Sequence, residues 1–211
     1  MMIVIANYLK LIFLRILIKS IGSERILCFY NNMVSKRKIS IYIDGSNFYF
    51  SIKKTFNCKI DIEKFCKKLV SDNDLISINY YISPLEQFSN PGMYAEQQSF
   101  FEKIKKIEKL KIIFGRLEKR KRDGEVYYIE KASDVNLALD LVLDAQKGIY
   151  EKAYLISNDG DFSGAVKSAI SFGKEVIYVA IGNKKSISHH LKKFASQTFY
   201  ITEGFIQDCK L

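Results

Sequence analysis

Four aspartates stand where strand-like segments of this chain give way to helical ones. Asp44 follows an apolar, β-branched run, Asp159 and Asp161 follow another such run, and Asp134 opens a helical segment. In an open parallel sheet, these points lie along one edge, outside the carboxyl ends of the strands. Carboxylates gathered there repel each other unless a cation lies between them. Oxygen ligands without matching His or Cys residues favour Mg²⁺ or Mn²⁺.

A divalent metal at such an edge points to phosphoryl chemistry. The ion can polarise a phosphoryl oxygen and lower the pKa of a water for in-line attack, and two ions would stabilise both the entering and the leaving oxygen. Each acid also has a structural interpretation, as a helix start for Asp134 or as a turn or cap for the others. The presence of an acid at every crossing favours the metal site. Asn47 either caps its helix or orients Asp44 and a water of the metal.

Other catalytic classes are excluded or disfavoured by the motifs that are missing. The sequence has no GxGxxG after its first strand and no GxxxxGK[ST], which excludes dinucleotide and P-loop sites. A haloacid-type phosphatase needs a second Asp where Ser46 stands. No Ser, Cys and His arrangement suggests acyl transfer, and His189 and His190 are expected at the surface. The 4 cysteines form no CxxC pair, so reduced thiols in a cytoplasmic protein are expected rather than structural zinc.

Alternating strands and helices define the expected fold class. Strands are predicted at 38–43, 75–82, 111–115, 153–157 and 175–180, with an edge strand at 198–201. Helices are predicted at 47–54, 61–70, 162–172 and 186–194, from Asn90-Pro91, and from Ser133 as a cap. The alternation indicates an α/β fold with a mainly parallel, right-handed sheet of about five strands flanked by helices. The first and fourth strands are expected to be neighbours at the switch point.

The helix that follows Ser133 is apolar on more than one side, so it is expected to be well buried. Asp140 lies six positions after Asp134, about 240° around a helix. It therefore does not share the face of Asp134, and it is expected to face solvent or to support the site from behind.

A basic hairpin is predicted between the third strand and Asp134. Asp123-Gly124 between extended flanks is a strong signal for a two-residue turn. Its cations would overhang the acidic edge and neutralise phosphates without reading sequence; they are Arg116, Lys119, Arg120, Lys121 and Arg122. Tyr127 and Tyr128 could stack bases of a single strand. The alternative is a solvated hairpin with both tyrosines packed on the sheet.

The net charge of +10 favours nucleic acid or an anionic membrane as partner, although a lysine excess can also reflect genome composition. Residues 1–34 form an apolar, basic extension before a domain at 35–211. Its apolar runs are too short for a confident membrane span, so stable membrane insertion is not expected. Three interpretations stay open: an amphipathic anchor, a docked helix, or translation that begins at Met33.

The motifs together resemble the NYN domain family, LabA-like branch, which is related to PIN-domain nucleases. The segments 41–47, 130–135, 137–140 and 157–162 carry the resemblance, which runs in order from about residue 38 to 201. It implies a PIN-like, Rossmann-like three-layer fold and cleavage of RNA that depends on Mg²⁺ or Mn²⁺. Departures are Asn158, where the family often has Gly, and the absence of a Pro near Ser163-Gly164.

The resemblance also implies roles for single residues. Asp44, Asp134, Asp159 and Asp161 match the metal-binding catalytic acids of the family, and Asn47 matches their partner. Lys131 and Asp140 also match, and Lys131 is expected to contact RNA. The leading hypothesis is a cytoplasmic endoribonuclease that acts on single-stranded or structured RNA. The alternative is an inactive or regulatory RNA-binding scaffold, and a homodimer stays open in either case.

Overall fold

A computed structural model describes residues 36–85, 90–122 and 125–211. The chain divides into two units, Met1–Lys36 and Arg37–Leu211. The second unit contains the whole fold described below. The predicted extension at 1–34 and its three interpretations lie outside the described residues. Within the described ranges, no helix has the length and apolar character needed to cross a membrane.

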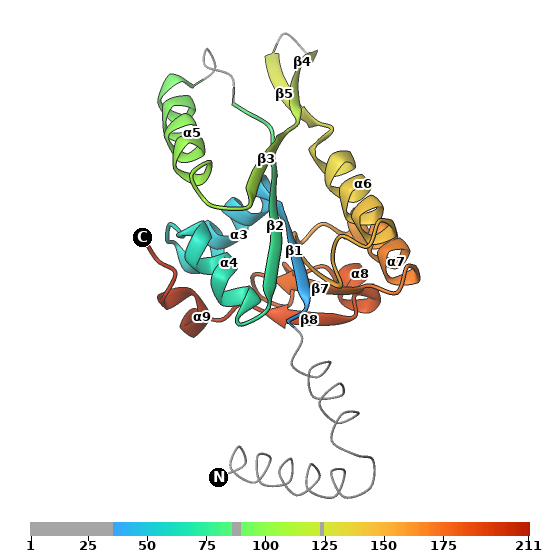
Figure 1. Cartoon of the computed structure of the whole chain (residues 1–211). Coiled ribbons are helices and arrows are strands. Elements are labelled where there is room, and N and C mark those ends of the chain that lie inside the picture. Colours follow the sequence, from blue (N-terminus) through green and yellow to red (C-terminus); the bar gives the residue numbers. More distant parts are fainter. Residues whose placement is uncertain (1–35, 86–89, 123–124) are drawn as a thin grey trace, which may run out of the picture. The chain divides into compact units, whose positions relative to one another are not determined.

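The described residues build one central sheet of six parallel strands, in the order β3-β2-β1-β6-β7-β8 (Figure 1). The strands are β1 (Lys38–Asp44), β2 (Asp74–Ile82), β3 (Leu110–Phe114), β6 (Lys152–Ile156), β7 (Glu175–Ala180) and β8 (Gln197–Tyr200). The sequence predicted a mainly parallel sheet of about five strands, and the parallel sheet is confirmed. The sixth strand is the predicted edge strand, which pairs with β7.

Helices cover both faces of the sheet, so the predicted three-layer α/β architecture is confirmed. One apolar cluster joins the sheet to α3 (Gly45–Phe56), α4 (Ile62–Val70), α5 (Pro91–Ile104) and α9 (Glu203–Gln207). A second cluster, on the opposite face, joins it to α6 (Ser133–Gln146), α7 (Ser163–Ser171) and α8 (His189–Phe194). Asp61 and Asn90 are the N-caps of α4 and α5, and the side chain of each accepts a hydrogen bond from a backbone amide in the first turn.

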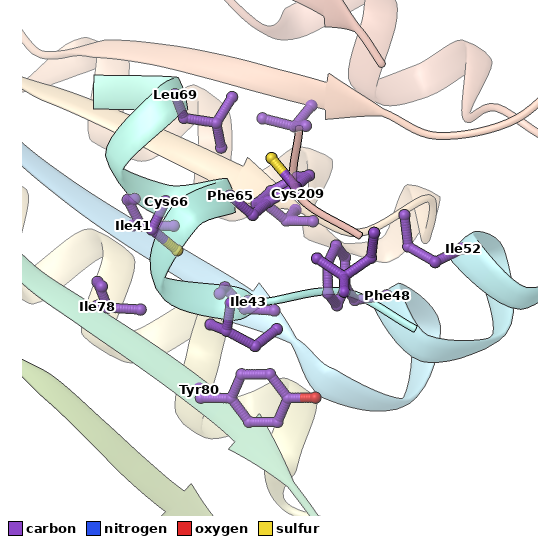
Figure 2. Packing of buried hydrophobic residues seen from close by; sticks show 14 of the residues in the cluster. Ile41, Ile43, Phe48, Ile52, Phe65, Cys66, Leu69, Ile78, Tyr80 and Cys209 are labelled. Carbon is purple, nitrogen blue, oxygen red and sulfur yellow. The ribbon is translucent and has the colours of Figure 1, made fainter. Parts of the chain in front are cut away.

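Strand β1 is central because its side chains are apolar on both faces. Ile41 and Ile43 belong to one cluster and Tyr42 to the other, and all three are fully buried. Figure 2 shows Ile41 and Ile43 among side chains of α3 and α4, including Phe48 and Phe65. Burying each such side chain stabilises the fold by about 1.5–3 kcal/mol, which fixes the strand whose end carries Asp44.

The order in which strands are added to the sheet changes side between β1 and β6. From β1 the chain passes to β2 and β3 on one side, and it later returns to β6, β7 and β8 on the other. Strand β1 pairs with both β2 and β6, so the predicted adjacency of the first and fourth strands is confirmed. Binding crevices form outside the carboxyl ends of strands at such a switch point.

The predicted basic hairpin is confirmed as β4 (Arg116–Arg122) and β5 (Glu125–Lys131), paired antiparallel. It forms a separate two-stranded sheet between β3 and α6, and it stands away from the central sheet in Figure 1. Its turn, Asp123-Gly124, lies outside the described residues. Because β5 leads directly into α6, the hairpin precedes the helix that carries Asp134.

The start of α6 differs from the prediction. Ser133 is the first residue of the helix and not its cap. The cap is Ala132, which has a left-handed backbone (φ 73) and no side-chain hydrogen bond to the helix. The left-handed backbone of Ala132 turns the chain sharply between β5 and α6. The helix therefore begins directly after this turn, without a capping side chain.

The burial predicted for α6 is also wrong. Leu137, Leu141 and Ala145 pack against the sheet, but Val135 and Leu139 are 60% and 53% exposed. The apolar residues wrap around more of the helix than the single face that meets the sheet. Composition alone therefore overestimated how much of this helix is covered.

Two further helix boundaries differ from the sequence. The segment predicted as one helix at 162–172 is a 3₁₀ turn, η1 (Gly160–Phe162), followed by α7. The last predicted helix, at 186–194, begins only at His189, because Ser188 caps α8 by accepting a hydrogen bond from the Leu191 amide.

Candidate active site

Asp44 is held at the carboxyl end of β1 by its own helix. It is the N-cap of α3, and its Oδ1 accepts a hydrogen bond from the Asn47 amide at 3.0 Å. The next residue must be glycine, because a Cβ on Gly45 would lie 2.5 Å from the Tyr80 ring and 2.9 Å from the Tyr81 carbonyl oxygen. The Asp-Gly pair thus lets α3 start tight against β2 with the Asp44 side chain at its tip.

Asn47 joins α3 to the loop after β6. Its Oδ1 accepts hydrogen bonds from the Asn158 amide at 3.0 Å and from the Ser51 hydroxyl at 3.2 Å. Of the two alternatives for Asn47, the helix cap is excluded, since Asp44 takes that position. Its side chain instead fixes the distance between the two strand ends that carry acids.

Ser157 ties Asp44 to Asp159. Its hydroxyl donates to Asp44 Oδ2 at 2.9 Å and accepts from the Asp159 amide at 3.0 Å. The residue is buried at the end of β6. Sequence reasoning did not give Ser157 a role, although its place directly before Asn158 and Asp159 was the available signal.

Asn158 is the most extensively bonded side chain of this loop. Its Nδ2 donates to the Ile181 carbonyl oxygen at 2.7 Å and to the Ser51 hydroxyl at 3.2 Å. Its Oδ1 accepts from the Tyr178 hydroxyl at 2.6 Å. Burial raises the pKa of Tyr178 to about 12, so this phenol stays protonated and donates at neutral pH. Asn158, a departure from the family pattern, therefore links three elements through bonds that a glycine cannot make.

Asp159 and Asp161 occupy different positions. Asp159 is half-buried and caps η1, with its Oδ1 accepting from the Asp161 amide at 3.0 Å. Asp161 is exposed. The structure therefore places Asp159 at the start of the 3₁₀ turn and the more exposed Asp161 within it.

A cavity of about 590 Å³ opens beside these residues, and three of the four predicted acids line it. They are Asp44, Asp134 and Asp159; the other lining residues are Ser46, Asn47, Phe50, Ser51, Lys54, Thr55, Asn158, Ile181 and Ser186. Asp161 is not among the lining residues. The structure thus brings three predicted acids to one hollow at the switch point and leaves the fourth outside its lining.

Two tyrosines of the sheet position α6, and with it Asp134. Tyr81 donates to Asp140 Oδ2 at 2.8 Å, and Tyr42 donates to Asp144 Oδ2 at 2.7 Å. Burial, together with these carboxylates, raises the pKa of both phenols well above its ordinary value. Asp140 is therefore a supporting residue, as the predicted 240° offset from Asp134 allowed. The role of Asp144 was missed, because nothing in the sequence indicates which tyrosine it meets.

We expect Tyr81→Phe to lower the free energy of unfolding by about 1–2 kcal/mol, because the part-buried Asp140 carboxylate loses the hydrogen bond that the Tyr81 hydroxyl donates to it. Urea denaturation followed by circular dichroism measures the change. Tyr49→Phe, at a 48% exposed ring on α3, is the control and should shift stability by only a few tenths of a kcal/mol. Equal effects of the two substitutions would contradict a specific role for the Tyr81 bond.

The donor chemistry of the cavity suits a hard divalent cation, since its lining includes carboxylate, hydroxyl and amide oxygens and neither His nor Cys. Within the described ranges, however, no group of three or more His, Cys, Asp or Glu side chains is placed so that it could hold a metal ion. Mg²⁺ does not require three, because it is commonly bound through one or two carboxylates, several waters and substrate phosphates. The residues therefore fit an open site of that kind and not a closed protein cage.

The predicted RNA-binding residues are described only in part. Arg116 and Lys121 are exposed on β4. Along the backbone, Lys119 is paired with Tyr128 and Arg120 with Tyr127. Six side chains lie outside the described part of the structure: Lys119, Arg120, Arg122, Tyr127, Tyr128 and Lys131. Their contact with RNA stays a prediction.

The parallel three-layer fold and the acids at its switch point define a PIN-like α/β domain. A sequence model of the NYN domain matches residues 38–203, so the chain belongs to the NYN domain family, which lies within the PIN-like superfamily. This confirms the family predicted from the motifs. The match does not distinguish the LabA-like branch, which stays a prediction.

The fold is also similar to that of a protein whose structure has been solved. This structure is the crystal structure of VPA0982, a protein of unknown function from Vibrio parahaemolyticus RIMD 2210633. The similarity has a TM-score of 0.64 at 21% sequence identity, and it covers 84% of this chain and 98% of that chain. Among proteins with curated descriptions, none matches this chain significantly.

Proposed function

We propose that this NYN domain is a metal-dependent endoribonuclease. The observation that carries the proposal is the convergence of Asp44, Asp134 and Asp159 on one cavity at the switch point of the sheet. Membership of the NYN family supports a nuclease in general terms. The proposal goes further than family membership and names RNA as the substrate and Mg²⁺ or Mn²⁺ as the ion.

The tied strand ends give Asp44 and Asp159 a fixed separation, which favours them as the residues that would hold the ion, with Asp134 facing them from α6. The hydrogen bonds that Asp44 accepts from Asn47 and Ser157 are compatible with this, because a carboxylate has about four lone-pair sites. When bound, a divalent ion supplies Lewis acidity toward a phosphate oxygen and a more acidic water. The chain itself orients the carboxylates and keeps Asp44 from turning away.

The basic hairpin is proposed to hold the RNA backbone next to this cavity. Arg116 and Lys121 are exposed cations on β4, and β5 runs directly into the helix that carries Asp134. Cations of this kind hold phosphates without selecting bases. We therefore expect weak sequence preference and binding that falls steeply as salt rises.

The test is cleavage of a labelled RNA by the purified full chain with Mn²⁺ or Mg²⁺. We expect turnover that EDTA abolishes and that Asp134→Asn lowers at least tenfold, because one cavity acid is lost. Asp72→Asn, at an exposed residue that does not line the cavity, is the matched control and should cleave as the wild type does. Undiminished cleavage by Asp134→Asn, or in EDTA, would exclude this site as the source of the activity.

A catalytically inactive RNA-binding scaffold is the second candidate. It is favoured by the lack of a ready-made metal group of three acidic, His or Cys side chains within the described residues. This candidate predicts RNA binding that is sensitive to salt, indifferent to EDTA and without turnover. The presence or absence of cleavage products in the same assay separates the two candidates.

A cytoplasmic location is also proposed. Cys58, Cys66 and Cys209 are free thiols in the structure, as expected where thiols are kept reduced. A homodimer stays a prediction.

A further inference from the structure

Helix α3 presents two different faces. Phe48 and Ile52 are 3% exposed and pack into the core. The opposite stripe lines the cavity; its residues are Ser46, Asn47, Phe50, Ser51, Lys54 and Thr55. Residues four apart lie above one another on a helix, so Phe50 and Lys54 follow Ser46 along the same wall. This wall runs away from Asp44 at the tip of the helix.

Phe50 is unusual on this wall because it is large, apolar and 64% exposed. Its ring is braced from the side by Tyr49, with ring centroids 5.3 Å apart and an interplanar angle of 73°. The Lys53 ammonium lies 5.7 Å from the centroid of the Tyr49 ring. An exposed apolar side chain alone is ordinary. An exposed ring that is held by a second ring at the wall of a cavity offers a face on which a base can stack.

Positive charge continues along the same wall. Lys54 is exposed, lies one helical turn beyond Phe50 and lines the cavity. Ser186 also lines the cavity, and the loop before it carries the exposed Lys184 and Lys185. Along α3, the acidic Asp44 therefore lies at the start of the helix and Lys54 in its last turn.

We propose that Phe50 and Lys54 form a subsite for unpaired nucleotides a few positions away from the phosphodiester that is cut, with Phe50 stacking a base and Lys54 binding a backbone phosphate. The subsite rests on the proposed function and names its substrate as single-stranded RNA, because a base within a duplex offers no free face to Phe50. Along α3, Phe50 and Lys54 lie about 9 and 15 Å from Asp44 at a rise of about 1.5 Å per residue. At about 3.4 Å per stacked nucleotide, these distances correspond to a few nucleotides.

Binding of an unstructured RNA oligonucleotide in EDTA tests the subsite without any cleavage. Fluorescence anisotropy measures affinity, and a 2-aminopurine base reports stacking through quenching. We expect Phe50→Ala to weaken binding about tenfold and to relieve the quenching, and Phe50→Trp to retain both. Phe172→Ala is the matched control, because Phe172 is a 45% exposed ring just before β7, at the opposite edge of the sheet. Its affinity should equal that of the wild type.

Lys54→Ala tests the phosphate contact. The slope of log affinity against log salt should fall in magnitude by about 0.7, the contribution of one phosphate contact to a single strand. Lys147→Ala, at an exposed lysine beyond α6, should leave the slope unchanged.

The outcomes distinguish this subsite from the ribonuclease proposal. Wild-type affinity and quenching in Phe50→Ala, or a wild-type protein that does not bind the oligonucleotide, would overturn the subsite whatever the cleavage assay shows. Binding that depends on Phe50, in a protein that never cleaves RNA with Mn²⁺ or Mg²⁺, would overturn the nuclease and support the subsite.

Discussion

Asp44→Asn is expected to lower RNA cleavage by roughly 10²–10³-fold, the scale seen when one group that stabilises charge in a transition state is removed. The substitution removes a negative charge from the tip of α3 while keeping the shape of the side chain. Initial rates on a labelled single-stranded RNA with Mn²⁺ measure the effect. Raising the Mn²⁺ concentration should recover part of the activity if the variant binds the ion more weakly.

The fold should survive this change. Asn caps helices about as well as Asp, so Oδ1 can still accept from the Asn47 amide. The new Nδ2 would face Ser157, whose hydroxyl can rotate to accept it. We therefore expect a change in unfolding free energy below about 1 kcal/mol.

Asp61→Asn is the matched control, because Asp61 caps α4 as Asp44 caps α3. Its backbone (φ −74, ψ 106) nearly equals that of Asp44 (φ −73, ψ 101), and its side chain accepts from the Lys64 amide at 3.0 Å. Asp61 does not line the cavity. Equal rates for wild type and both variants would show that the cleavage comes from a contaminating nuclease or from another site.

The strands and helices of this fold were predictable from sequence where the residues within each segment determine its structure. The apolar run that ends at Asp44 is buried on both faces, and its neighbours in the sheet follow from the alternation of strands and helices. The helices predicted from Asp61 and from Asn90-Pro91 begin at those positions, with Asp61 and Asn90 as their caps. In contrast, Ser133 looked like a cap but is not one, because the left-handed Ala132 was invisible in the residue types.

The acids of the candidate site were also predictable, since three of them line one cavity, but the bonds that place them were not. Ser157, Tyr178 and Tyr42 act through contacts between segments far apart in sequence. Such contacts depend on the register of the strands and on the tilt of α6, which no local pattern records. The position of Asp161 has a local cause, because the 3₁₀ turn after Asp159 replaces the regular helix start expected there.

Asn158→Ala is expected to lower the free energy of unfolding by about 2–4 kcal/mol, because it removes three hydrogen bonds that each contribute about 1 kcal/mol and leaves part-buried partners. The same bonds hold the loop that aims Asp159, so RNA cleavage should fall at least tenfold at a temperature where the variant is still folded. Urea denaturation and initial cleavage rates measure the two effects.

Asn136→Ala separates this network from any general effect of losing an asparagine. Asn136 is half-exposed on α6, where alanine is the better helix former, so stability should stay level or rise by a few tenths of a kcal/mol. Asn158→Gly, with the residue that the family often has at this position, should be at least as destabilising as alanine, because glycine also frees the backbone. A glycine variant as stable and active as the wild type would mean that the loop holds Asp159 through its backbone alone. The Asn158 bonds to Ser51, Ile181 and Tyr178 would then be dispensable for the geometry of the site.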